Sequence, residues 1–235
     1  MKLRHSLIVP ICTILVAGAA QSPTDLLKST FAKMDAAAAS FKGMTADVKK
    51  ISHFDAIGEN DVSTGTMTVK RARAKDLRMR ADLQQPDRRL FCFADRKGQV
   101  FNPKTNTVQI YDVSKKNTVM AEQLLLLGFG SSAADVETGY SVKLGGEETI
   151  NGQKAVRLEL IPKSHDLAVS FPKVELWISE AGENSGVAVQ QKFHQQANDY
   201  LMATYTNMKF NPNLPDSAVK CDLPKDVQKE YPMGH

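Results

Sequence analysis

The chain has 235 residues, with 30 Lys and Arg against 26 Asp and Glu, which gives a formal net charge of +4 at pH 7. Hydrophobic residues make up 42% of it, a fraction that is typical of a folded globular protein and excludes a disordered one. Because the two signs of charge nearly balance, a protein that binds nucleic acid through a general positive field is disfavoured, and no nucleic-acid partner is expected.

The first 19 residues have the three-part pattern of a secretory signal peptide. Lys2 and Arg4 precede an apolar run over 7–20, and small residues at 17–19 form a cleavage site. The apolar run is about 14 residues long, shorter than the roughly 20 needed to span a membrane. The sequence predicts export to the periplasm, removal of residues 1–19, and one domain over 20–235 that is expected to be a monomer.

An amphipathic helix is predicted to follow and to end near Ser40. Ser22 can cap its start, and Pro23 suits the first helical position. The spacing of three and four residues between apolar side chains predicts one buried stripe along this helix. The stripe consists of Leu27, Phe31, Met34 and Ala38.

From residue 41 the hydrophobic period changes to two, which is typical of β-strands. Turn residues separate many of the alternating runs, and Asn151-Gly152 is the strongest hairpin signal. About eleven short strands joined by tight turns predict a mainly β fold, either a barrel or one strongly curved antiparallel sheet. The predicted strands are 41–52, 63–71, 76–83, 89–95, 98–102, 107–112, 140–147, 153–162, 173–179, 187–195 and 200–210.

Two segments break the strand pattern. Residues 118–130, TVMAEQLLLLGFG, predict a short helix that ends at Gly128, and 131–138 predict a further helical turn. Because four consecutive leucines place apolar surface on most sides of a helix, this helix is expected to be buried or to face an apolar ligand. The tail after 212 is expected to be a loop, with one edge strand near 219–222.

The basic stretch 67–80, MTVKRARAKDLRMR, holds six bases and one acid. Since alternate residues of a strand point to opposite faces, most of these bases are expected on a solvated outer face. Arg71 is the exception, because its parity in the strand is that of the apolar residues. The apolar side of the two strands is predicted to carry Met67, Val69, Leu77 and Met79.

A guanidinium that faces an apolar interior needs hydrogen-bond acceptors. It effectively never deprotonates, and burying its charge unpaired costs at least several kcal/mol. Backbone carbonyls of a covering helix, or water in a cavity, would serve as acceptors for Arg71. The alternative is an edge position from which Arg71 reaches solvent, and the pattern alone leaves both interpretations open.

Two cysteines, Cys92 and Cys221, follow the predicted signal peptide. The periplasm permits a disulfide between them, and two separate buried thiols are the alternative. The sequence carries no metal-binding spacing, nucleophile motif or phosphate-binding loop. We therefore expect neither an enzyme nor a cofactor or metal site.

Four motifs follow one another after the predicted signal peptide and helix, and the similarity to which they belong extends from about residue 24 to about residue 222. They are 65–71 (GTMTVKR), 95–103 (DRKGQVFNP), 124–130 (LLLLGFG) and 210–216 (FNPNLPD). In order and spacing they resemble the LolA family, the periplasmic carriers of outer-membrane lipoproteins, and more closely its lipoprotein-sorting branch. This chain has Ala72 where the family often has proline.

The resemblance implies an unclosed, eleven-stranded barrel with helices over its concave side and an apolar cavity for acyl chains between them. It also implies that Arg71 holds a helical lid closed by hydrogen bonding, since Arg71 occupies the position of the family's arginine. The residues expected to line the cavity and the lid are Arg71, Met67, Val69, Leu77, Met79, Phe31, Met34, Leu125 and Leu126.

The implied function is carriage of lipoprotein acyl chains across the periplasm, without a cofactor. Loading would come from an inner-membrane ATP-driven transporter, and unloading would go to an outer-membrane receptor. One alternative is a carrier or sensor of another lipid or glycolipid on the same fold, as in an envelope-stress regulator. An exported hydrolase is disfavoured, because no catalytic motif is present.

Overall fold

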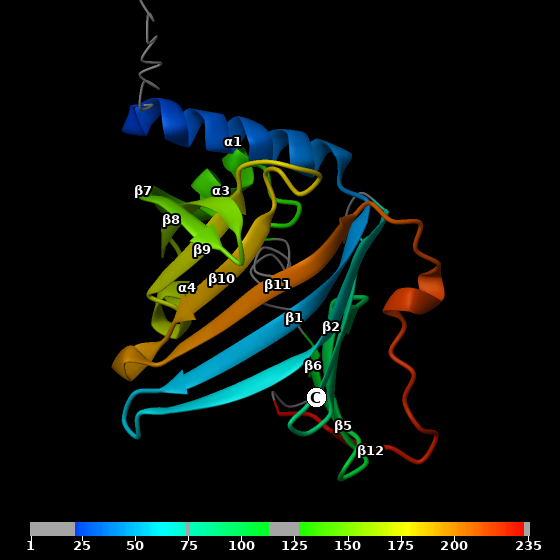
Figure 1. The fold of residues 1–235 in the computed structure, drawn as a ribbon. Helices are drawn as coiled ribbons and strands as arrows, with labels where there is room; N and C mark the ends of the chain where they lie inside the picture. Colours follow the sequence, from blue (N-terminus) through cyan, green and yellow to red (C-terminus); the bar gives the residue numbers. More distant parts are fainter. Residues whose placement is uncertain (1–21, 74–75, 113–126, 233–235) are drawn as a thin grey trace, which may run out of the picture.

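The structure, a computed structural model, describes residues 22–73, 76–112 and 127–232. Twelve strands of this part of the chain form one strongly curved sheet in the order β12-β6-β5-β4-β3-β2-β1-β11-β10-β9-β8-β7 (Figure 1). The first and last strands of that order do not pair, so the sheet is not closed. This confirms the predicted mainly β fold with a curved, unclosed sheet.

The strands are β1 Gly43–Phe54, β2 Glu59–Arg73, β3 Asp76–Gln85, β4 Arg89–Ala94, β5 Lys97–Asn102, β6 Thr107–Asp112, β7 Tyr140–Ile150, β8 Gln153–Pro162, β9 Lys173–Ser179, β10 Ala188–His194, β11 Tyr200–Phe210 and β12 Gln228–Glu230. The helices are α1 Pro23–Ser40, α3 Ala133–Gly139 and α4 His165–Ser170, with short 3-10 turns η1 Gln196–Asn198 and η2 Asp216–Val219. No helix in the described ranges is long and apolar enough to cross a membrane. The predicted signal peptide and most of the predicted leucine-rich helix lie outside these ranges.

Strand alternation gives the sheet two faces. Val69 of β2 is the cross-strand neighbour of Met44 on one side and of Met79 on the other. This face, which we call the inner face, packs with α1 and α3 into the main apolar core. The opposite, outer face carries charged side chains such as Arg78 and Arg80, as the alternation predicted. The inner face includes Met67, Val69, Leu77 and Met79.

Helix α1 begins and ends where the sequence predicts. Ser22 accepts a hydrogen bond from the backbone of Asp25 and caps the first turn. The fully buried line of the helix is displaced by about one residue from the predicted stripe and includes Thr30. Burial of this threonine is tolerated because its hydroxyl donates to the carbonyl oxygen of Leu26 at 2.9 Å. The buried residues of α1 are Leu26, Thr30, Met34 and Ala37.

The tail after 212 is mostly a loop with one edge strand, but the predicted position of that strand was wrong. The edge strand is β12, not 219–222, and it pairs in parallel with β6. Cys221 is instead bonded to Cys92 on the outer face of β4, with an S–S distance of 2.17 Å. Leu223 and Val227 pack beside this disulfide. The tail therefore crosses the outer face through side-chain contacts before it reaches the edge of the sheet (Figure 1).

Removal of the crosslink tests this arrangement. Changing Cys92→Ala together with Cys221→Ala is expected to lower the free energy of unfolding by about 2–4 kcal/mol, because a disulfide restricts the unfolded chain. Urea unfolding measures the loss, with Ser217→Ala in the exposed η2 turn as the control. Finding two free thiols in unfolded, unreduced protein that begins at residue 20 would contradict the disulfide.

Candidate functional site

Arg71 lies on the inner face near the end of β2, as the cross-strand neighbour of Leu77. Its Nη1 donates to the carbonyl oxygens of Ala38 at 3.3 Å and Phe41 at 3.5 Å, and its Nη2 donates to that of Gly130 at 3.1 Å. The guanidinium carbon also lies 5.3 Å from the centroid of the Phe41 ring. We call these interactions the closing contact, because they join β2 to the end of α1 and to the loop before α3.

The chemistry of a helix end explains why an arginine suits this position. The last carbonyls of a helix have no partner within the helix, and the helix dipole makes that end negative. Helix α1 has no basic residue in its own last turn. Arg71 supplies the missing cation from the sheet, and its guanidinium remains charged at any physiological pH.

Asn211 fixes the connection between α1 and β1. Its Oδ1 accepts from the backbone N–H groups of Lys42 at 2.7 Å and Gly43 at 3.3 Å, while its Nδ2 donates to the carbonyl oxygen of Ser40 at 2.8 Å. Asn211 has a φ of +53°, a left-handed conformation that asparagine tolerates better than most residues. The late motif 210–216 thus fastens the same end of α1 that Arg71 holds.

Further polar contacts hold the middle of α1. Lys33 and Glu180 form an ion pair at 2.7 Å. Asp35 accepts a hydrogen bond at 2.7 Å from the backbone N–H of Ala133, at the start of α3. A Cβ atom at Gly186 would lie 2.2 Å from the carbonyl oxygen of Lys33, so the chain passes α1 there at a distance that only glycine allows. These polar groups can all be satisfied by water if α1 moves away.

The loop ahead of α3 is seated against β10 through Gly128. Its carbonyl oxygen accepts from the backbone N–H of Ala188 at 2.7 Å. Gly128 has a φ of +82°, and a Cβ atom there would lie 2.5 Å from the Cβ of Ala188. On either side of this glycine, Leu127 and Phe129 are buried in the main core.

Two buried polar side chains of the sheet, Gln191 of β10 and Tyr205 of β11, hold this loop by hydrogen bonds. Tyr205 donates to Oε1 of Gln191 at 2.8 Å, and Nε2 of Gln191 donates to the carbonyl oxygen of Leu127. Burial raises the pKa of Tyr205 above its usual range, so its hydroxyl stays protonated and remains a donor. Sequence reasoning missed this pair, because a lone glutamine or tyrosine within an alternating strand gives no signal of its partner.

The predicted site residues are distributed around the junction of α1 and the sheet. Met34, Met67, Val69 and Leu77 are buried in the main core, and Phe31 and Met79 are partly buried against it. Leu125 and Leu126 lie outside the described residues. The structure therefore brings six of the predicted apolar residues together with Arg71, and the expected acyl-chain cavity stays a prediction.

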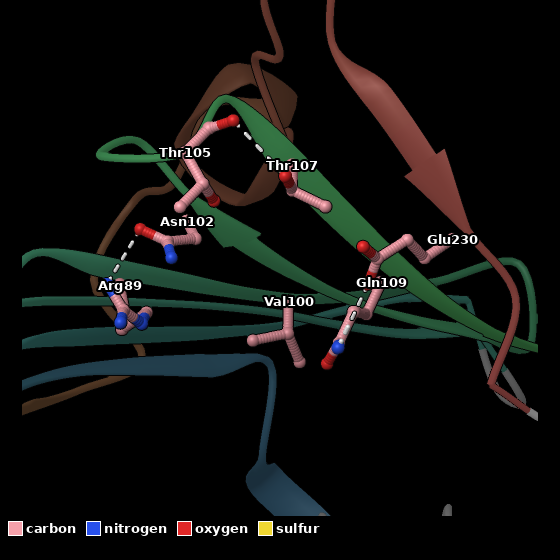
Figure 2. Close-up of a pocket in the computed structure, with 7 residues that line it drawn as sticks. All are labelled: Arg89, Val100, Asn102, Thr105, Thr107, Gln109 and Glu230. Atoms are coloured by element: carbon pink, nitrogen blue, oxygen red, sulfur yellow. Dashed lines mark hydrogen bonds between the residues drawn. The ribbon is translucent and has the colours of Figure 1, made fainter.

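A separate pocket of about 360 Å³ lies where the inner face reaches the β12 edge (Figure 2). Its wall continues the main core, because Val100 in the pocket pairs with Phe91, which packs against that core. Most of the lining side chains are polar, and none of them was predicted as a site residue. The pocket is lined by Arg89, Val100, Asn102, Thr105, Thr107, Gln109 and Glu230.

No protein-family model matches the sequence, and a search of curated proteins found no match. Among solved structures, the chain is similar to a LolA superfamily protein from Nitrosomonas europaea, with 14% identity, 83% of this chain and 97% of that chain covered, and a TM-score of 0.43. It is also similar to an uncharacterized conserved protein from Thermus thermophilus, with 15% identity, 90% and 99% coverage and a TM-score of 0.49. A third is the MucA/MucB complex of Pseudomonas aeruginosa, with 14% identity, 83% and 60% coverage and a TM-score of 0.48. LolA superfamily proteins are thus among the structures that this chain resembles, as the order of its motifs predicted.

Loss of the closing contact should be visible without any ligand. Arg71→Leu is expected to raise amide hydrogen exchange in the last turn of α1 by about tenfold or more, since hydrogen bonds from charged groups contribute about 1.5–3 kcal/mol. The matched control is Arg73→Leu, which removes an exposed base from the same strand. Equal exchange in the two variants would show that Arg71 does not hold the helix.

Two glycines with nearly the same positive φ angle separate the cost of backbone strain from the cost of steric overlap. Gly152→Ala, at a φ of +81° with nothing within 4 Å of the new Cβ, is expected to cost about 1 kcal/mol of unfolding free energy. Gly128→Ala is expected to cost about 1–3 kcal/mol more, because its Cβ would overlap Ala188. Urea unfolding compares them, and equal losses would mean that the loop is not pressed against β10.

Proposed function

We propose that this protein is a non-enzymatic periplasmic carrier that binds the acyl chains of lipoproteins and moves them from the inner to the outer membrane. The closing contact is the observation that carries the proposal. A permanently charged side chain on an apolar face donates to backbone carbonyls of two covering segments, the end of α1 and Gly130. Such hydrogen bonds can hold α1 and the loop before α3 against the sheet without using the apolar side chains between them.

The composition of the core supports a role in holding flexible chains. An acyl chain gains about 0.8 kcal/mol for each methylene group that it buries, so a carrier must offer apolar burial comparable to a bilayer. Methionine side chains adapt their shape to irregular ligands, because they are unbranched and have several rotatable bonds. The core contains Met34, Met44 and Met67, and Met79 and Met208 are partly buried against it.

The same contacts explain how a carrier could release its cargo. Opening α1 would break the bonds of Arg71 and the ion pair between Lys33 and Glu180, and water would replace them. The free energy of that opening is subtracted from the free energy of cargo binding. A carrier built in this way binds acyl chains less tightly than its open form alone would, so the cargo can pass to a stronger acceptor.

The transporter that loads the carrier and the receptor that unloads it belong to the same proposal. Both would need to open and close α1, the element that the closing contact holds. Carriage or sensing of another lipid is the second candidate, and the polar pocket beside the apolar core is the observation that favours it. The two functions share the inner face and differ in the group attached to the acyl chains.

Native mass spectrometry of the protein purified without detergent from its own periplasm tests the cargo. A bound triacylated lipoprotein is expected at low occupancy in the unchanged protein. In Arg71→Leu its occupancy is expected to be about tenfold higher, because the variant loses the free energy of the closing contact, and a tenfold change corresponds to about 1.4 kcal/mol. The control is again Arg73→Leu. A bound lipid of another class, with no lipoprotein in any variant, would replace lipoprotein carriage by the second candidate.

A further inference from the structure

The inner face changes from apolar to polar along the direction that crosses its strands. One lateral row of cross-strand neighbours runs from Ala81 through Phe91 and Val100 to Gln109 and Glu230. The row beside it runs from Leu83 to its neighbour Arg89, which is hydrogen-bonded to Asn102, and on to Thr107. The apolar ends of both rows belong to the main core, and the polar ends line the pocket (Figure 2). A surface graded in this way suits an amphiphile that lies across the strands.

Arg89 lines this pocket, and only one nitrogen of its guanidinium donates hydrogen bonds to described residues. Its Nη1 donates to the side-chain oxygen of Asn102 at 2.8 Å and to the carbonyl oxygen of Arg88 at 3.0 Å. Both of these hydrogen bonds come from Nη1, and within the described residues Nε and Nη2 of Arg89 donate to no protein atom. These two nitrogens form the side-on edge of the guanidinium, which binds an oxyanion through two parallel hydrogen bonds.

The preceding residue, Arg88, differs from Arg89 because both nitrogens of the same guanidinium edge donate to a carboxylate. Nε and Nη2 of Arg88 both donate to the carboxylate of Asp82 on the outer face, at 3.0 and 2.8 Å. The hydrogen bond from Arg88 holds the pKa of Asp82 below its usual range. Arg89 has the opposite strand parity, faces the pocket, and has no such carboxylate in the described residues.

Glu230 supplies the opposite charge at the other end of the pocket. Strands β4 and β12 are separated by β5 and β6 in the sheet, so Arg89 and Glu230 come from walls about 14 Å apart at the usual strand spacing. One oxygen of Glu230 accepts from Gln109 at 3.2 Å, and its carboxylate is exposed. The pocket thus presents a cation at one wall and an anion at the other, with hydroxyl and amide groups between.

We infer that the pocket binds the phosphate-bearing head group of a glycerophospholipid, with the phosphate on Arg89 and an amine of the head group toward Glu230. The acyl chains would lie over Phe91 and Ala81 and enter the main core. This assignment rests on the proposed binding of acyl chains and adds a second lipid class to it. Phosphatidylethanolamine has the required pair of charges, whereas phosphatidylglycerol lacks the amine.

Isothermal titration with short-chain, monomeric ligands tests the inference. The ligands are dihexanoyl phosphatidylethanolamine, dihexanoyl phosphatidylglycerol, dihexanoylglycerol and inorganic phosphate. Phosphatidylethanolamine is expected to bind about tenfold tighter than dihexanoylglycerol, and Arg89→Gln to remove that difference, since a charge-assisted bidentate contact is lost. Glu230→Gln should abolish the preference for the ethanolamine over the glycerol head. The control is Arg96→Gln, an exposed base in the β4–β5 turn.

The outcomes separate the two proposals. If dihexanoylglycerol binds as tightly as both phospholipids, and Arg89→Gln changes nothing, the head-group assignment is overturned while acyl-chain binding stands. If inorganic phosphate binds in an Arg89-dependent way but no lipid binds more tightly, the pocket is an anion site and the lipid assignment fails. If no acyl ligand binds at all, including to Arg71→Leu, the proposed function itself fails.

Discussion

The charge of Arg71 constrains the structure around it. It sits on the face of β2 that also carries Val69, and it cannot be neutralised by losing a proton. Its position is tolerable only where carbonyl oxygens converge, and the end of α1 together with Gly130 supplies them. The placement of the helix, the loop and the strand thus follows from the need of one guanidinium for acceptors.

That need explains why residues far apart in the sequence share one junction. Asn211 at the end of β11 positions the chain just after α1, so that the carbonyl oxygen of Phe41 faces Arg71. Gln191 and Tyr205 hold the loop that presents Gly130. Arg71 and Asn211 both bond to backbone groups at the end of α1, so water can reach these groups when the helix moves away. The hydrogen bond from Gln191 to Leu127 is buried and keeps the loop in place.

Periodicity predicted much of the fold, because burial on one face imposes a period of two on every strand. It placed Arg71 with Met67 and Val69, and it identified the hairpin at Asn151-Gly152, where Asn151 has a φ of +48°. It could not predict the parallel β12, since three exposed residues show no alternation of burial. The stripe of α1 was displaced because the pattern counts Thr30 as polar, whereas its hydroxyl is satisfied within the helix.

The polar pocket lies beyond the reach of sequence reasoning for a different reason. Its residues come from β4, β5, β6, β12 and the turn between β5 and β6. Only the pairing of the strands shows that Arg89, Asn102 and Thr107 lie side by side. A charged residue at the first position of a short strand looks like any solvated base in the sequence. The motif 210–216 gave a partial signal, because it marked Asn211 by resemblance without indicating which groups it would bind.

An open sheet has two edges, and each exposes backbone groups that could pair with another molecule. At one end β12 pairs with Thr107–Gln109 of β6, and the tail that delivers it is anchored across the outer face by the bond between Cys92 and Cys221. At the other end the register of β7 shifts between Leu144 and Gly146, which interrupts a regular pairing edge. The crosslink therefore has an effect far from its two sulfur atoms. It anchors the tail that covers part of β6 with a strand of three exposed residues, and a short, charged edge strand is a poor template for pairing with another molecule.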